Sequence, residues 1–365
     1  MLRTSRIMLW AGILAISLGA VLAQAEEVGL FRADLQNSGV YKTKGVAQMS
    51  GVKWQYSSGS NYINGVVGNG LFFFTVRDEK VIALDLSTGA LKWSFKTDGN
   101  ISSAPAYKNG LVYAGSKGNN LYAINASTGL KEWKASVDGD VSTAPLIYGD
   151  LIYVGLSNNR LYALELKNGR VRWEFKAKDN ISSSPAYANG LIYFGSDDVN
   201  LYALDAKTGA KKWSYRAGSN INSSPAVVGG AVYFGCTDDS LYALNADTGE
   251  LKWSFKSGMS IDSSPAVWEG LVFFGSNDEN FYALDAQTGT KKWSFKADQA
   301  IKSSPSIAEG VVYFGSNDGN FYALDARTGN LKWKFEAGGE ISCSPVVLDG
   351  MVIFGNTKNV VYALK

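Results

Sequence analysis

The stretch 202-YALDAKTGAKKW-213 returns in varied form every 40 residues along most of this chain. Its closing tryptophan marks the copies, at Trp93, Trp133, Trp173, Trp213, Trp253, Trp293 and Trp333. A fixed period of this length indicates one supersecondary unit copied along the chain. Fold and function must therefore be inferred from the array and not from one isolated motif.

One copy, residues 181–217, predicts four short strands. The segments 182-SSSPAYA-188, 191-LIYFG-195, 201-LYALDA-206 and 211-KKWSYRA-217 are rich in aliphatic and aromatic residues, and Gly, Asn, Asp and Thr-Gly clusters separate them. These are strand and turn signals. A helix is not predicted, because Gly or Pro interrupts every apolar stripe of helical period. A single sheet of this kind cannot bury both faces, but it can when it packs radially against its copies. The sequence therefore predicts an all-β propeller with four-stranded antiparallel blades.

The number of blades can be counted from the alanine of the third strand. It recurs eight times, at Ala83, Ala123, Ala163, Ala203, Ala243, Ala283, Ala323 and Ala363. The eighth copy lacks its own tryptophan strand, but 50-SGVKW-54 near the N-terminus matches 329-GNLKW-333 in the last complete copy. We expect eight blades, with the N-terminal strand pairing into the C-terminal blade and removing the open edge.

The first 25 residues predict a secretory signal peptide. Arg3 and Arg6 precede an apolar run over residues 7–22, and 23-AQA-25 fits the small-residue cleavage pattern. An uncleaved membrane anchor is the alternative, and it needs about 20 apolar residues. We expect a signal peptide over 1–25, a leader segment over 26–50 and the propeller over 51–365. The mature protein is then periplasmic or extracellular, with no inserted segment, and we expect a monomer.

Charge excludes one class of partner. Without Arg3 and Arg6 the chain has 33 basic and 33 acidic residues. A neutral protein with no long basic stripe attracts neither DNA nor an anionic membrane, so no nucleic-acid partner is expected.

The composition also argues against several kinds of enzyme. The chain has no His, which excludes His-based triads, His-ligated zinc and C-x-x-C-H haem attachment. Its two cysteines, Cys236 and Cys343, cannot form a four-thiolate site and lie on blades too far apart for a disulfide. The Asp that recurs between the second and third strands, as at Asp198, fits a turn residue better than a ring of calcium sites. We expect no catalytic residues, no metal and no cofactor.

The repeated pattern A-x-D-x-x-T-G-x-x-x-W, as in Ala203 to Trp213, resembles the tryptophan-docking motif of the pyrroloquinoline-quinone (PQQ) type propellers. The segment 31-FRADLQNSGVY-41 also resembles the leader of secreted members. The resemblance implies that eight tryptophans dock between neighbouring blades: Trp54, Trp93, Trp133, Trp173, Trp213, Trp253, Trp293 and Trp333. Dehydrogenases of this family bind PQQ with calcium in the central channel and are usually longer, and many carry a vicinal Cys-Cys that this chain lacks. The architecture also resembles the propeller lipoprotein of the outer-membrane β-barrel assembly machinery, although no lipid-anchor Cys follows the apolar run.

Candidate binding residues lie where the copies differ. The loops that enter the inner strands share the pattern I-x-S-S-P, and x varies through Ser102, Ser142, Ser182, Asn222, Asp262, Lys302 and Ser342. A structural requirement would have kept x alike in all copies, so the positions where x differs are the better candidates for ligand contact. Neutral drift among exposed loop residues is the alternative explanation. The candidate binding face comprises Asn222, Asp262, Lys302, Ser342 and Ser182.

Two function classes remain. The first is a noncatalytic scaffold that binds an unidentified protein partner or ligand. The second is a PQQ- and calcium-dependent dehydrogenase or a small-ligand sensor that uses the central channel.

Overall fold

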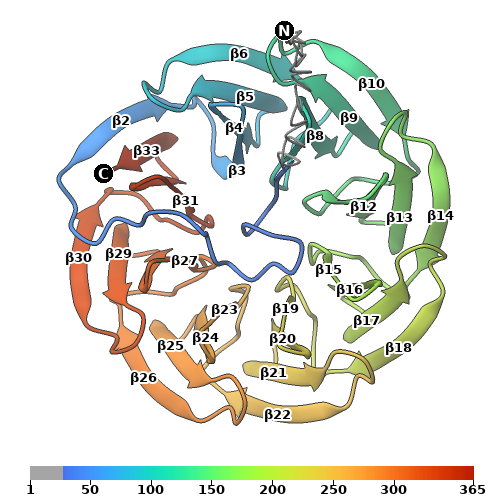
Figure 1. Cartoon of the computed structure of the whole chain (residues 1–365). Helices are drawn as coiled ribbons and strands as arrows, with labels where there is room; N and C mark the ends of the chain where they lie inside the picture. The colour runs from blue at the N-terminus through green and yellow to red at the C-terminus, as the bar shows by residue number, and fades with distance from the viewer. Residues whose placement is uncertain (1–27) are drawn as a thin grey trace, which may run out of the picture.

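The computed structural model describes residues 28–365, which form a closed ring of eight four-stranded blades (Figure 1). In one blade β1 (Val28–Gly29) adds a fifth strand to the sheet. The region enclosed by the inner strands is called the channel here. The predicted all-β propeller of eight antiparallel blades is confirmed. The predicted signal peptide lies outside the described residues.

Each blade runs from an inner strand at the channel to an outer strand at the rim. In chain order the blades are β3 (Tyr62–Gly68), β4 (Leu71–Val76), β5 (Lys80–Asp85), β6 (Leu91–Lys96); β7 (Ala106–Lys108), β8 (Leu111–Ser116), β9 (Asn120–Asn125), β10 (Lys131–Ser136); β11 (Leu146–Tyr148), β12 (Leu151–Gly155), β13 (Arg160–Glu165), β14 (Val171–Lys176); β15 (Ala186–Ala188), β16 (Leu191–Gly195), β17 (Asn200–Asp205), β18 (Lys211–Arg216); β19 (Ala226–Val228), β20 (Ala231–Gly235), β21 (Ser240–Asn245), β22 (Leu251–Lys256); β23 (Ala266–Trp268), β24 (Leu271–Gly275), β25 (Asn280–Asp285), β26 (Lys291–Lys296); β27 (Ser306–Ala308), β28 (Val311–Gly315), β29 (Asn320–Asp325), β30 (Leu331–Glu336); and β31 (Val346–Leu348), β32 (Met351–Gly355), β33 (Val360–Leu364), β2 (Val52–Ser57).

The last blade closes the ring as predicted. Strand β2 pairs antiparallel with β33, with Trp54 opposite Ala363. The first strand of the ring therefore supplies the outer strand of the last blade, and no sheet edge stays open at the seam.

Seven of the eight inner strands are shorter than predicted, and only β3 has seven residues. We expected residues 182–188 to form one strand, but β15 spans only Ala186–Ala188. The preceding serines bond to the next blade instead: the Ser184 amide donates to Ser224 Oγ at 3.0 Å, and the Ser224 amide donates to Ser264 Oγ at 2.9 Å. The repeated serines thus join neighbouring blades around the channel.

Seven of the eight repeat tryptophans lie against the turn glycine of the following blade, whereas Trp333 Nε1 donates to the carbonyl of Val46 in the leader. Trp213 Nε1 donates to the carbonyl of Ala246 at 3.0 Å. A Cβ added at Gly249 would lie 2.6 Å from the Trp213 ring, and Gly249 has a φ of 76°. Glycine is needed there both for the close ring contact and for the left-handed backbone. Trp133 differs from Trp213, because its Nε1 has no partner among residues 28–365.

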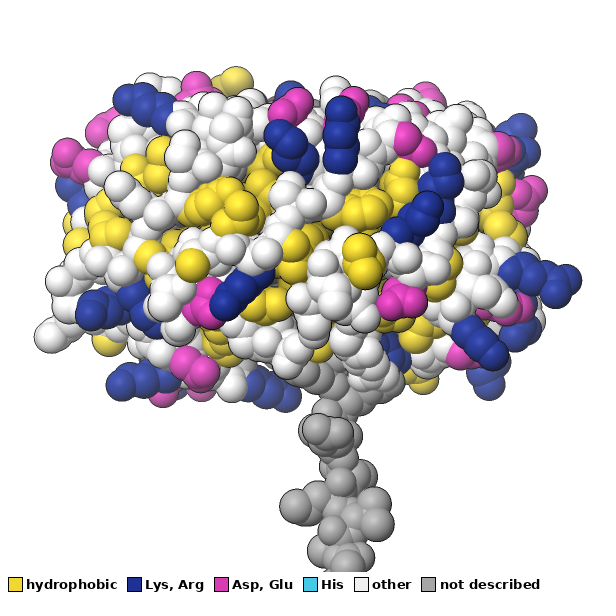
Figure 2. Space-filling model, turned by 90° about the horizontal axis from the view of Figure 1, so that it is seen from above, with side chains coloured by type: hydrophobic (Ala, Val, Ile, Leu, Met, Phe, Trp, Pro, Cys, Tyr) yellow, Lys and Arg dark blue, Asp and Glu magenta, His cyan; other side chains and the backbone are white. Residues whose placement is uncertain are grey.

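The outer wall carries charges of both signs. The repeat Asp205 closes its turn by accepting from the amides of Lys207 and Thr208, and it also faces Lys212 at 3.4 Å. Figure 2 shows Lys and Arg interspersed with Asp and Glu along the visible side of the ring. This view shows no basic stripe of the kind that binds nucleic acid.

Both cysteines are free and buried, which confirms that they do not form a disulfide. Cys343 Sγ accepts from the Gly355 amide at 3.3 Å, as Ser263 Oγ does from Gly275 at 3.2 Å. The thiol thus replaces a serine hydroxyl of the repeat.

The leader, residues 28–46, crosses the channel inside the ring of inner strands (Figure 1). It starts as β1 (Val28–Gly29), which pairs antiparallel with β7. Its carbonyls at Leu35, Gln36, Ser38 and Gly39 then accept from the amides of Tyr187, Val227, Val267 and Ile307 at 2.7–2.9 Å. These four donors hold one repeat position in four consecutive blades, so the leader satisfies a channel-facing amide in each of those four blades.

Candidate functional site

The two ends of the ring differ in what they expose. One end, here the loop end, carries the I-x-S-S-P segments such as 181–185 and the loops between second and third strands such as 196–199. The opposite end, here the turn end, carries the tight turns such as 189–190 and 206–209. The leader lies toward the turn end, where the Gly350 amide donates to the Lys44 carbonyl and Thr43 bonds to Asp349. All five predicted binding residues lie at the loop end.

Two of the predicted residues contact each other directly. Ser182 Oγ lies 3.2 Å from Asn222 Oδ1 and 3.0 Å from Asp197 Oδ1. Burial raises the pKa of Asp197 above its ordinary value; the hydrogen bond from Ser182 opposes this effect, and the nearby carboxylates of Asp179 and Asp198 add to it. The raised pKa makes Asp197 a candidate functional residue beside Ser182.

The other predicted residues are more separate. Asp262 accepts from Asn277 Nδ2 at 2.9 Å. Lys302 is exposed and makes no ion pair within residues 28–365. No hydrogen bond or ion pair among the described residues joins Asn222, Asp262 and Lys302, so they form neighbouring positions and not one cluster.

Ser342 lies in a polar pocket of about 250 Å³ beside the closing blade. The pocket is lined by Arg77 and Glu340 and by the polar side chains of Asn61, Asn64, Ser102, Asn356 and Thr357. Tyr62 also lines it and is buried, and its hydroxyl has no partner among the described residues. This pocket brings a cation and a carboxylate next to the predicted Ser342.

Sequence reasoning missed Arg77. Its column in the repeat was available: residues 77, 117, 157, 197, 237, 277, 317 and 357 read Arg, Lys, Ser, Asp, Thr, Asn, Asn and Thr. This position varies as widely as x, and it faces the same end of the ring. A comparison of both columns would have predicted Arg77 and Asp197 as well.

The recurring Asp between second and third strands has a structural role. Asp238 Oδ1 accepts from the Ser240 amide at 3.0 Å, and its Oδ2 accepts from Tyr242 at 2.6 Å and from the Gly218 amide at 3.0 Å. Burial raises its pKa, but the hydrogen bonds from Tyr242, Cys236 and Ser240 outweigh that and leave the pKa below its ordinary value. The interpretation as a turn residue is confirmed here.

The channel holds one buried cation from the leader. Arg32 is 3% exposed; its Nη2 donates to the carbonyl of Pro265 at 2.7 Å, and Nη1 has no partner among residues 28–365. Burial lowers the Arg32 pKa to about 10, against the opposing effects of Tyr41 and Asp34, so the side chain is charged at neutral pH. Within the described part of the chain, no group of three or more Cys, Asp or Glu side chains is placed to hold a metal ion.

The comparisons with known proteins bear on this geometry. The profile of the family described as outer membrane protein assembly factor BamB matches residues 40–183, 174–261 and 256–365. The chain belongs to the BamB family. This confirms the predicted resemblance to PQQ-like propellers, since BamB and a methanol dehydrogenase are both among the similar structures.

Solved structures share the BamB-family propeller at low identity. BamB from Moraxella catarrhalis is 18% identical with a TM-score of 0.74, over 87% of this chain and all of that one. A europium-containing methanol dehydrogenase is 15% identical with a TM-score of 0.79, over 93% of this chain and 98% of that one. The computationally designed Ika8 protein is 16% identical with a TM-score of 0.76, over 86% and 97%. Comparison with curated protein sequences gives no match. An enzyme and a designed protein on one fold show that the fold alone does not select the function.

Proposed function

We propose that this BamB-family protein is a noncatalytic scaffold of the cell envelope, located in the periplasm, that binds a protein partner at the loop end. One observation carries the proposal: at the loop end, neighbouring copies present polar side chains that differ from copy to copy, on a frame that the repeated serines and tryptophans hold constant. The leader runs toward the opposite end and leaves these loops uncovered. The description of the family as an assembly factor supports a role in protein interaction. Residues 28–365 contain no helix long and apolar enough to cross a membrane.

A PQQ- and calcium-dependent dehydrogenase or a small-ligand sensor is the alternative, because similar structures include such an enzyme. The side chains that could supply oxygen ligands to calcium do not favour the enzyme. Calcium takes six to eight oxygen ligands, several of them from carboxylates. Among the described residues there is no such acidic group, and the leader places the guanidinium of Arg32 inside the channel.

The test is site-specific photo-crosslinking in cells that make the full-length protein. We expect adducts with one partner from probes at Asn222 and Lys302, both exposed at the loop end. Matched probes at Asp247 and Arg327, on the turn end of the same two blades, should give none. The triple variant Asn222→Ala, Asp262→Ala, Lys302→Ala should reduce the adduct formed by a probe at Ser182 without lowering Tm.

Equal adducts from both ends of the ring would contradict a loop-end site. The enzyme alternative has its own assay, with the purified mature protein, PQQ, calcium and an alcohol or sugar. Saturable, calcium-dependent dye reduction would contradict the scaffold proposal and support the dehydrogenase alternative.

A further inference from the structure

The inner strand β11 has channel-facing backbone groups that the leader does not satisfy. Ile147 lies opposite Ile152 in the β11–β12 pair, as Tyr187 lies opposite Ile192 in the β15–β16 pair. The Tyr187 amide points into the channel and donates to Leu35 at 2.7 Å. By the same register the amide and carbonyl of Ile147 point into the channel, yet neither has a hydrogen-bond partner among residues 28–365. A buried, unpaired amide is costly, and Ile147 is only 2% exposed.

The leader shows how an extended chain pairs at this position of the repeat. Ile307 holds the position in another blade, and it donates to the Gly39 carbonyl at 2.8 Å and accepts from the Tyr41 amide at 2.8 Å. Val40 thereby forms a parallel bridge with Ile307. The inner strand can therefore accept one added strand from the channel side.

A turn in the leader leaves β11 without a pairing strand. After pairing with β7, the chain turns inward at Arg32 and Ala33, which have φ values of 58° and 77°. The turn sends the Arg32 side chain to Pro265, and pairing resumes only when Leu35 reaches β15. The leader thus passes β11 without bonding to it.

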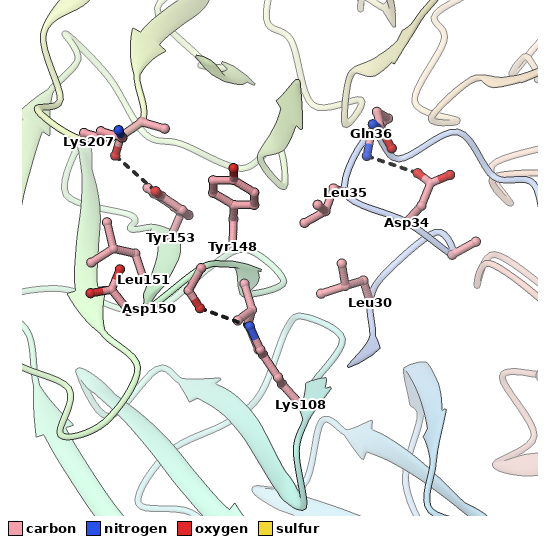
Figure 3. Close-up of a pocket in the computed structure, with 14 residues that line it drawn as sticks. Leu30, Asp34, Leu35, Gln36, Lys108, Tyr148, Asp150, Leu151, Tyr153 and Lys207 are labelled. Carbon is pink, nitrogen blue, oxygen red and sulfur yellow. Dashed lines mark hydrogen bonds between the residues drawn. The ribbon is translucent and has the colours of Figure 1, made fainter. Parts of the chain in front are cut away.

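The space in front of β11 is a pocket of about 650 Å³, within the range of ligand sites. Figure 3 shows Leu30 and Leu35 of the leader on one side of it and Tyr148 and Leu151 on the other. Tyr148 is 39% exposed and stacks on Tyr187 with ring centroids 3.7 Å apart. The charged lining residues balance, with Lys108 and Lys207 against Asp34 and Asp150.

We infer that this pocket binds an extended, uncharged peptide segment of a partner, which adds a strand to β11. One peptide carbonyl accepts from the Ile147 amide, and the amide two residues further along the peptide donates to the Ile147 carbonyl. The Gly39 carbonyl and the Tyr41 amide bond to Ile307 in the same way. A flanking aliphatic or aromatic side chain enters the apolar pocket beside Tyr148 and Leu151. Added strands are a common mode of peptide recognition. The site lies away from the loop end, so it is independent of the scaffold function proposed above.

Amide hydrogen exchange of the full mature protein tests this inference. The probe is an equimolar pool of acetylated tetrapeptide amides without charged residues, each with an aliphatic or aromatic second residue. At about ten times the Kd of the pool, exchange at Ile147 should slow about tenfold. Val347 is the internal control: it holds the same position on β31, but the pocket beside it is only about 150 Å³. Its exchange should not change.

A matched pair of variants locates the site. Leu151→Trp fills the pocket and should abolish the protection of Ile147. Leu191→Trp changes the equivalent, equally half-buried residue one blade on and should preserve it. Unchanged exchange at Ile147, equal slowing at Val347, or protection that survives Leu151→Trp would each overturn the inference.

Discussion

Removing the indole of Trp213 tests how the blades are held together. Loss of a large buried aromatic side chain costs about 3–5 kcal/mol, and Trp213 is only half-buried, so Trp213→Ala should destabilise the protein by about 3 kcal/mol. The structure also separates the ring contact from the hydrogen bond. Trp213→Phe keeps an aromatic ring over Gly249 but loses the bond to Ala246, which contributes about 1 kcal/mol.

Trp133 is the control for the hydrogen bond. It packs on Gly169 and lies 5.8 Å from Tyr113, much as Trp213 lies 5.9 Å from Tyr193, but its Nε1 has no partner in the described chain. Urea unfolding should therefore show Trp213→Phe to be more destabilising than Trp133→Phe by about 1 kcal/mol. Equal costs would mean that the indole bond contributes nothing. A cost under about 1 kcal/mol for Trp213→Ala would refute interblade packing by the ring.

Two further predictions use the titrating groups. Because burial raises the pKa of Asp197 in the folded state, ionisation there opposes folding at neutral pH, and the penalty fades as pH falls below the raised pKa toward that of the unfolded chain. Asp197→Asn should therefore leave Tm unchanged or higher at pH 7 and equal to wild type at pH 3; a lower Tm at pH 7 would contradict this. Burial also raises the pKa of Cys236 to about 11 and that of Cys343 to about 12, so both thiols should react slowly in the native protein. Thiol titration of the denatured, unreduced protein should give two per chain, whereas a count of zero would mean that they are paired.

Much of the fold follows from the repeat itself. Strands, blade number and closure were predicted because each depends on a local pattern that recurs at a fixed period. The length of the inner strand was not, since Ser184 can bond either within its blade or to the next one, and only the packed ring selects Ser224. The path of the leader was also hidden, because residues 28–46 have no copy elsewhere in the chain against which to compare them.

The candidate site was predicted in part. Variation between copies placed Ser182 and Asn222 at one end of the ring, where they are in contact. Arg77 and Ser342 come together only because the first and last blades are neighbours in the closed ring, and a scan of one column of the repeat does not show this. Their role in binding stays a prediction.

The seam between β2 and β33 has a consequence for the order of folding. Ser50 bonds to Lys365 across 315 residues, and Thr43 bonds to Asp349 across 306. At about 5–20 residues per second, synthesis of the intervening chain takes about 15–60 seconds. The leader and β2 must stay without their distant partners for that time, while intermediate blades already pack on one another. Contacts this far apart in sequence form slowly. We therefore expect the ring to close late in folding, after the intermediate blades have formed.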